Sequence, residues 1–251
     1  MSTHRSNEST TAMPLGLLVA EAPARAGVFE RHGMNYWCEG ERTLGELLAE
    51  KGLDPELIVR ELATADAERP TRGEEDWTHA GAGALLEHIQ AVHHQFLKEE
   101  LPELSVIVGK VSILHGTIDS ELRELHNVFE WFRADMEMLM RKEELVLFPM
   151  CVRVEQSAVR PRFFCDSIRI PIQEIAEEHR AAAYALDRIY ALSNRFSPPP
   201  DACNTYQEML GRLSRLNMDT HLHVHEESNI LFPRVIALEE SLPEESRRAE
   251  S

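Results

Sequence analysis

The sequence predicts an all-α protein in which a small N-terminal helical domain precedes an up-down four-helix bundle. Three observations lead to this prediction. Leu, Ala and Glu are abundant and aromatic residues make up only 6% of the chain, a composition that favours helices. Long stretches of helical character fill the C-terminal two-thirds, and no segment alternates apolar and polar residues as a strand would. That part of the chain also contains an internal repeat, whose two copies are 84 residues apart.

Five regions follow one another along the chain. Residues 1–12 are polar and are expected to be disordered. Residues 13–65 hold several short helical stretches and form the small N-terminal domain. Residues 66–77 combine Pro, Gly and mixed charge, which is typical of a linker. Residues 78–237 form the bundle, and the acidic residues 238–251 are expected to be a flexible tail.

Start and stop signals place the individual helices. In the small domain, Asp54 is the expected N-cap of a helix whose first residue is Pro55. In the bundle, Pro149 and Pro233 are expected to end the second and fourth long helices, because proline cannot continue a hydrogen-bonded helix. The four bundle helices are then predicted to begin near residue 85 and to cover residues 120–148, 171–193 and 201–231.

The internal repeat centres on two glutamates. Glu143 stands five residues before the pair Phe148-Pro149, and Glu227 stands five residues before the pair Phe232-Pro233. Both glutamates lie in segments with helical periodicity. The repeat therefore predicts two similar helical hairpins that each present a carboxylate.

Histidines accompany the glutamates at matching distances. His223 lies four residues before Glu227, so the two share a helix face, whereas Leu139 occupies that position in the first copy. Upstream, His94 precedes Leu139 by 45 residues and His179 precedes His223 by 44. Histidine and glutamate that face a shared interior are typical of a carboxylate-bridged metal site in a four-helix bundle.

A purely structural interpretation of these residues, without a metal, has to be weighed against the metal site. A single helical histidine is more often a surface or satisfied core residue, and the Phe-Pro pairs are adequate as simple helix stops. Matched spacing in two halves is nevertheless hard to obtain by chance, and burying two carboxylates without a cation would cost several kcal/mol each. We therefore favour the metal site. The remaining histidines that fail one or other matching test are interpreted as surface or outer-shell residues: His115, His126, His221 and His225.

Bulk properties exclude several classes of function. A net charge of −17 would repel a nucleic-acid backbone. The four cysteines are widely spaced and form no CxxC, so nothing calls for a disulfide framework. The chain starts without an apolar signal-peptide core and has no apolar run of 18 residues. We expect a cytoplasmic protein with neither a nucleic-acid partner nor a membrane.

Several segments resemble the iron–sulfur cluster repair di-iron proteins, the Repair of Iron Centers family within the hemerythrin-like group. The resemblance covers about residues 13–237, and the N-terminal segment makes it specific, because hemerythrin-like bundles at large lack that segment. The segments that carry it are FERHGMNYWCEGERTLGELLAEKGLDPELI, EHIQAVHHQFLKEELPEL, RKEELVLFPM, IAEEHRAA, SPPPDACNTY and HVHEESNILFPR.

The resemblance implies a hemerythrin-like bundle with a non-haem di-iron centre, held by three histidines and two bridging glutamates: His94, His179, His223, Glu143 and Glu227. The family's remaining ligand histidine falls on Leu139, so one of the two irons is expected to be weakly bound. Asp135, one turn before Leu139, is a candidate substitute ligand. The family also carries two adjacent cysteines where this chain has Trp37-Cys38, which leaves Cys38 as a single candidate redox thiol.

The family's activity implies repair of iron–sulfur clusters damaged by nitric oxide or peroxide, with damaged iron–sulfur proteins as partners. Repair would proceed by iron donation or by processing of NO. The sequence leaves open whether the site turns over NO, as an enzyme would, or only binds it. The alternatives are an NO- or O2-binding scavenger or sensor with a degenerate site, and a scaffold without metal. Retention of five of six ligand positions argues against the scaffold. A homodimer is also left open.

Overall fold

The computed structural model describes residues 9–67, 77, 80–117 and 119–244. The predicted linker lies mostly outside the described residues, as do most of the N-terminal segment and the end of the tail. Two compact units divide the chain: Met1–Gly81 with Val224–Pro233, and Ala82–His223 with Arg234–Ser251. In the described residues the secondary structure is helical, with one isolated β-bridge between Pro14 and Thr43. The all-α prediction is confirmed.

Short helices build the N-terminal part of the first unit: α2 (Leu15–Glu21), η1 (Pro23–Arg25), α3 (Ala26–Arg31), α4 (Leu44–Lys51) and α5 (Pro55–Ala67). Local sequence fixes their ends. Thr43 and Glu46 form a capping box at the start of α4, and Gly52 ends it in the left-handed conformation at φ 64°. The Asp54 carboxylate accepts a hydrogen bond from the Glu56 backbone N–H, as predicted for an N-cap.

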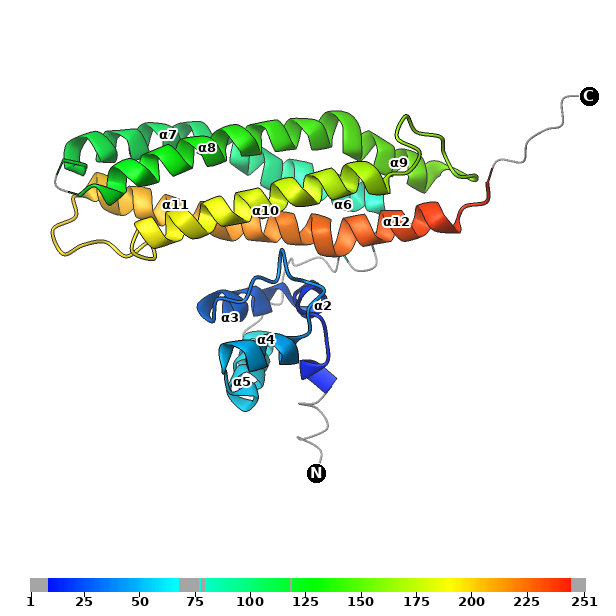
Figure 1. The fold of residues 1–251 in the computed structure, drawn as a ribbon, viewed down its shortest axis with the longest axis horizontal. Coiled ribbons are helices and arrows are strands. Elements are labelled where there is room, and N and C mark those ends of the chain that lie inside the picture. The colour runs from blue at the N-terminus through cyan, green and yellow to red at the C-terminus, as the bar shows by residue number, and fades with distance from the viewer. Residues whose placement is uncertain (1–8, 68–76, 78–79, 118, 245–251) are drawn as a thin grey trace, which may run out of the picture. The chain divides into compact units, whose positions relative to one another are not determined.

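In the described residues the elements from Ala82 onward form four long helical rods. Successive rods run antiparallel, because each connection joins neighbouring ends (Figure 1). The first, second and fourth rods are each built from several helical segments, whereas the third rod is the single helix α10. In chain order the elements are α6 (Ala82–Ile89), η2 (Gln90–His94) and α7 (Gln95–His115), then α8 (Glu121–Lys142), η3 (Glu143–Leu147) and α9 (Phe148–Gln156), then α10 (Arg169–Leu192), and finally α11 (Asn204–His225), η4 (Glu226–Leu231) and α12 (Phe232–Ser241).

The prediction that Pro149 and Pro233 end their helices is wrong. Both rods continue through the proline, as α9 and α12. The reason is a π-helical turn just before each proline: η3 precedes Pro149 and η4 precedes Pro233. Each proline then occupies the second position of a fresh α-helical segment, where its missing N–H and fixed φ cost little.

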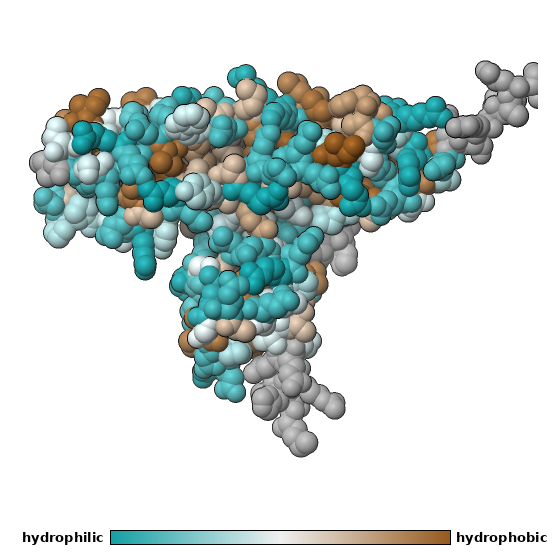
Figure 2. Space-filling model, viewed as in Figure 1, coloured by the Kyte–Doolittle hydropathy of each residue, from teal (hydrophilic) through white to brown (hydrophobic). Residues whose placement is uncertain are grey.

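Outside the composite turns, the bundle is a conventional packed core with a polar exterior. Leu104, Leu125, Phe129 and Met136 are completely buried in it. On the face shown in Figure 2, hydrophilic residues predominate over the bundle and hydrophobic residues form small separate patches. Of the helices in the described ranges, none combines the length and apolar character needed to cross a membrane.

In the first unit, the side chain of Asn229 from η4 fits against two glycines of the N-terminal part. A Cβ atom at Gly40 would lie 2.0 Å from Asn229 Oδ1, and one at Gly16 would lie 2.7 Å from the same atom. Asn229 Nδ2 donates a hydrogen bond to the Tyr36 carbonyl at 3.1 Å and lies 3.0 Å from His225 Nδ1. Burial lowers the pKa of His225 to about 4, although the charge of neighbouring Glu226 raises it, so this imidazole is a neutral acceptor.

Gly40→Ala is expected to destabilise the first unit by about 1–3 kcal/mol, because the added methyl group collides with a side chain that is held on both sides. Gly27→Ala is the matched control. Its Cβ would meet only the end of Arg31 at 3.8 Å, and alanine favours helix α3 by up to about 1 kcal/mol. Denaturant unfolding of both variants measures the difference. Equal stability of the two would show that the glycine contact has no energetic role.

Candidate metal centre

The histidines and glutamates that the sequence singled out lie on all four rods of the bundle. Three of them belong to π-helical turns or adjoin one, and the other two lie inside α-helices. In chain order they are His94 at the end of η2, Glu143 at the start of η3, His179 within α10, His223 near the end of α11 and Glu227 within η4. All five are buried, with at most 2% of the residue exposed.

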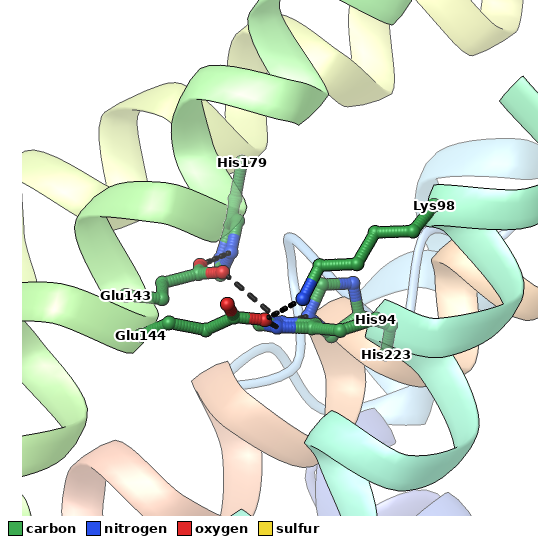
Figure 3. A network of polar contacts seen from close by, with 6 residues as sticks. All are labelled: His94, Lys98, Glu143, Glu144, His179 and His223. Carbon is green, nitrogen blue, oxygen red and sulfur yellow. Dashed lines mark hydrogen bonds and ion pairs between the residues drawn. The ribbon is translucent and has the colours of Figure 1, made fainter. Parts of the chain in front are cut away.

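Side-chain nitrogen and oxygen atoms converge at this point of the bundle (Figure 3). His94 Nε2 lies 3.1 Å from His223 Nε2 and 3.3 Å from Glu143 Oε2. His179 Nε2 lies 3.4 Å from the other carboxylate oxygen, Glu143 Oε1. The two oxygens of Glu143 therefore face imidazoles from two different helices, which is the arrangement of a carboxylate that bridges two cations.

Glu227 completes the cluster from the fourth rod, one helical turn after His223. One donor atom each from His94, Glu143, His223 and Glu227 lie within 4.8 Å of one another. Two carboxylates with no exposure to water would cost several kcal/mol each in their charged form without a compensating cation. Imidazole nitrogen and carboxylate oxygen together suit iron, and the same donors also suit zinc and manganese. The residues present thus fit a bridged two-cation site.

A second carboxylate orients His94. Glu144 Oε1 lies 2.7 Å from His94 Nδ1 and 2.6 Å from Lys98 Nζ, and Figure 3 shows the three side chains together. Burial raises the pKa of Glu144, but the hydrogen bonds from Lys98 and His94 outweigh it and leave the pKa below its usual value. An ionised carboxylate only accepts, so His94 Nδ1 donates and Nε2 keeps its lone pair for a metal.

Glu144→Ala is expected to weaken cation binding on the His94 side about 10–100-fold, because the imidazole loses the partner that fixes its tautomer and orientation. Glu130→Ala is the control, since Glu130 is a half-buried glutamate of the same rod that is paired with Ser105 and Arg133. Competition with a chromogenic chelator measures the affinity. An unchanged affinity in Glu144→Ala would show that His94 is held by packing alone.

The position of the expected sixth ligand is apolar. Leu139 is 2% exposed and lines a cavity of about 220 Å³ together with Asp135 and Ala182. Asp135 is exposed, and it is absent from the groups of converging donor atoms in the described residues. Its role as a substitute ligand stays a prediction.

The other sequence-predicted groups lie elsewhere. Cys38 is half-buried in the first unit, and all four cysteines of the chain are thiols. Of the histidines that failed the spacing test, His221 and His225 are buried, whereas His115 and His126 are partly exposed.

Comparison with known proteins adds a family to this geometry. The model of the hemerythrin HHE cation binding domain matches residues 85–235, and ScdA_N, a domain of unknown function (DUF542), matches residues 11–66. The chain is 34% identical to the iron-sulfur cluster repair protein YtfE of Escherichia coli (strain K12 / DH10B) over 224 residues, which are 89% of this chain and 96% of that protein. The chain belongs to this iron–sulfur cluster repair family. The YtfE protein of Shigella boydii serotype 4 (strain Sb227) matches to the same extent.

Membership of the iron–sulfur cluster repair family confirms the resemblance seen in the sequence and makes the bundle a cation-binding domain. Sequence spacing did not reveal Glu144 or Lys98, because both look like ordinary charged residues on a solvated helix face. It also did not reveal the π-helical turns at His94, Glu143 and Glu227. Such turns are rare in proteins overall, and those that occur are often found at functional sites. The Phe-Pro pairs were the sequence feature that marked two of these π-helical turns, those at Glu143 and Glu227.

Proposed function

We propose that this protein holds a non-haem di-iron centre and takes part in the repair of iron–sulfur clusters damaged by nitrosative or oxidative stress. The observation that carries the proposal is Glu143, whose two buried oxygens face His94 and His179 on different helices. The names of the relatives support the same role. Repair proceeds by iron donation or by processing of NO, and damaged iron–sulfur proteins of the cytoplasm are the partners.

Bound iron would supply redox chemistry and an open position for NO or O2. The chain's own residues prepare the site for it. Glu144 fixes the Nδ1 proton of His94 and so leaves Nε2 available. Glu143 and Glu227 would offset the charge of two cations.

Reactivation of a damaged cluster protein tests the proposal. A [4Fe–4S] dehydratase is inactivated with NO and then incubated with the iron-loaded protein or with His179→Ala as the matched control. We expect recovery of dehydratase activity with the unmodified protein and little recovery with His179→Ala. Equal recovery with both proteins, or recovery equal to that given by free ferrous iron, would contradict the proposed role.

The cavity at Leu139 favours a second candidate, an NO- or O2-binding scavenger or sensor. An apolar side chain stands where the family has a ligand, and the cavity of about 220 Å³ beside it accommodates a diatomic molecule. A single-turnover reaction with NO separates the two functions. Release of nitrous oxide supports processing in the course of repair, whereas a nitrosyl adduct that persists without product supports the scavenger or sensor.

A further inference from the structure

A second group of potential ligands lies beside the bridged centre and takes no part in it. Its donor atoms come from His88 at the end of α6, His93 within η2 and Glu226 at the start of η4, and they lie within 4.8 Å of one another. His93 is the chain neighbour of His94, and Glu226 is the neighbour of Glu227. Adjacent residues thus serve two different groups of donors.

His93 is held in the same way as His94. Its Nδ1 lies 2.9 Å from Asp219 Oδ1 of helix α11, just as His94 Nδ1 lies 2.7 Å from Glu144 Oε1. A carboxylate on Nδ1 selects the tautomer that leaves the Nε2 lone pair for a cation. The contact with Asp219 thus leaves His93 Nε2 able to bind a cation together with the other donors of the group.

Ring contacts pack His93 against its neighbours. The rings of His93 and His223 stack at 5.7 Å between centroids with an interplanar angle of 14°, and the ring of His88 meets that of His93 edge-on at 5.6 Å. His93 is 4% exposed, whereas His88 is partly exposed. The group is thus anchored in the core at His93 and is open to solvent at His88, unlike the bridged centre.

We propose that His88, His93 and Glu226 form a mononuclear site for a divalent first-row transition cation, oriented by Asp219 and separate from the bridged centre. Two imidazoles and one carboxylate form the donor set of mononuclear non-haem Fe(II) sites and of His2Glu zinc sites. The three ligands leave positions for water, and the partial exposure of His88 lets the cation exchange with solvent. Such a site holds an exchangeable cation next to the buried centre, and its existence does not depend on the proposed function.

Equilibrium titration of the metal-free full-length chain with Co(II) tests the site, with visible absorption and calorimetry as readouts. The unmodified chain is expected to bind one more equivalent of Co(II) than His88→Ala does. In His88→Ala the affinity for that equivalent should fall at least 100-fold. Glu226→Gln is expected to lose the same equivalent. His126→Ala, which removes a partly exposed imidazole from helix α8, is the matched control and should lose nothing. His179→Ala, which damages the bridged centre, should retain the extra equivalent.

Two outcomes would overturn the proposal. The first is an unchanged number of Co(II) equivalents in both His88→Ala and Glu226→Gln. The second is loss of the extra equivalent in His179→Ala together with its retention in His88→Ala, which would place that cation in the bridged centre. Because His88 is partly exposed and alanine is a strong helix former, its substitution should leave the fold intact, and helical circular dichroism checks this directly. A failure here leaves the test by dehydratase reactivation untouched.

Discussion

Replacing His223 or Glu227 with alanine is expected to remove most of the iron that the protein carries. These residues form the intact His-x-x-x-Glu pair on one helix face, and both are completely buried. Loss of an outer-shell partner alone typically weakens a metal site about 10–100-fold, so loss of a direct ligand should cost at least as much. Iron per chain after gel filtration measures the effect.

A control and a second readout separate a ligand from a structural residue. His126→Ala should keep its iron, because this histidine is partly exposed and is absent from the groups of converging donor atoms in the described residues. Glu227→Gln should lower the unfolding temperature of the loaded protein and leave that of the metal-free protein unchanged or raised, because a neutral amide removes a buried charge. Unchanged iron in His223→Ala or Glu227→Ala would refute the assignment.

Leu139→His is expected to raise iron occupancy toward two per chain and to make the second iron resist a chelator wash. Leu139 lies one helical turn before Glu143 and is 2% exposed, so an imidazole there faces the interior next to the bridging carboxylate. The cavity of about 220 Å³ beside it gives the new ring room to reach its rotamer. The unmodified chain should hold fewer than two irons after the same wash.

The matched control is Leu114→His, which adds an imidazole at a position that is 57% exposed on helix α7. It should leave iron occupancy unchanged. Two irons that survive the wash in the unmodified chain, with no gain in Leu139→His, would mean that another side chain fills the gap. Asp135→Ala is then the next variant, because Asp135 lines the same cavity. If neither variant alters iron binding, the alignment of the first hairpin onto the second is wrong.

Residue spacing was sufficient to predict the helical class and the convergence of four helices. The matched positions of His94 and His179, and of Glu143 and Glu227, required antiparallel rods of similar length, which is how the bundle is built (Figure 1). The failure at the Phe-Pro pairs has a simple cause. The rule that proline ends an α-helix assumes hydrogen bonds between residues four apart. In a π-helical turn the bonded residues are five apart, and the rule does not take this into account.

Other parts of the site depend on tertiary packing and could not come from spacing. Glu144 belongs to the second rod, whereas His94 and Lys98 belong to the first, and only the packing of the two rods brings Glu144 to both of them. The pairing of His93 with Asp219 spans 126 residues in the same way. The contact of Asn229 with Gly16 and Gly40 depends on two backbone segments that approach without an intervening Cβ, which a reading of helical periodicity cannot register.

The most direct test of the di-iron assignment is Mössbauer spectroscopy with iron quantification on protein purified from its native host and briefly washed with chelator. The assignment predicts non-haem iron at more than one but fewer than two atoms per chain, in two inequivalent environments, with the same spectrum in His88→Ala. Iron no higher than in His223→Ala, or a single mononuclear environment at one atom per chain, would contradict the bridged centre at Glu143 and Glu227.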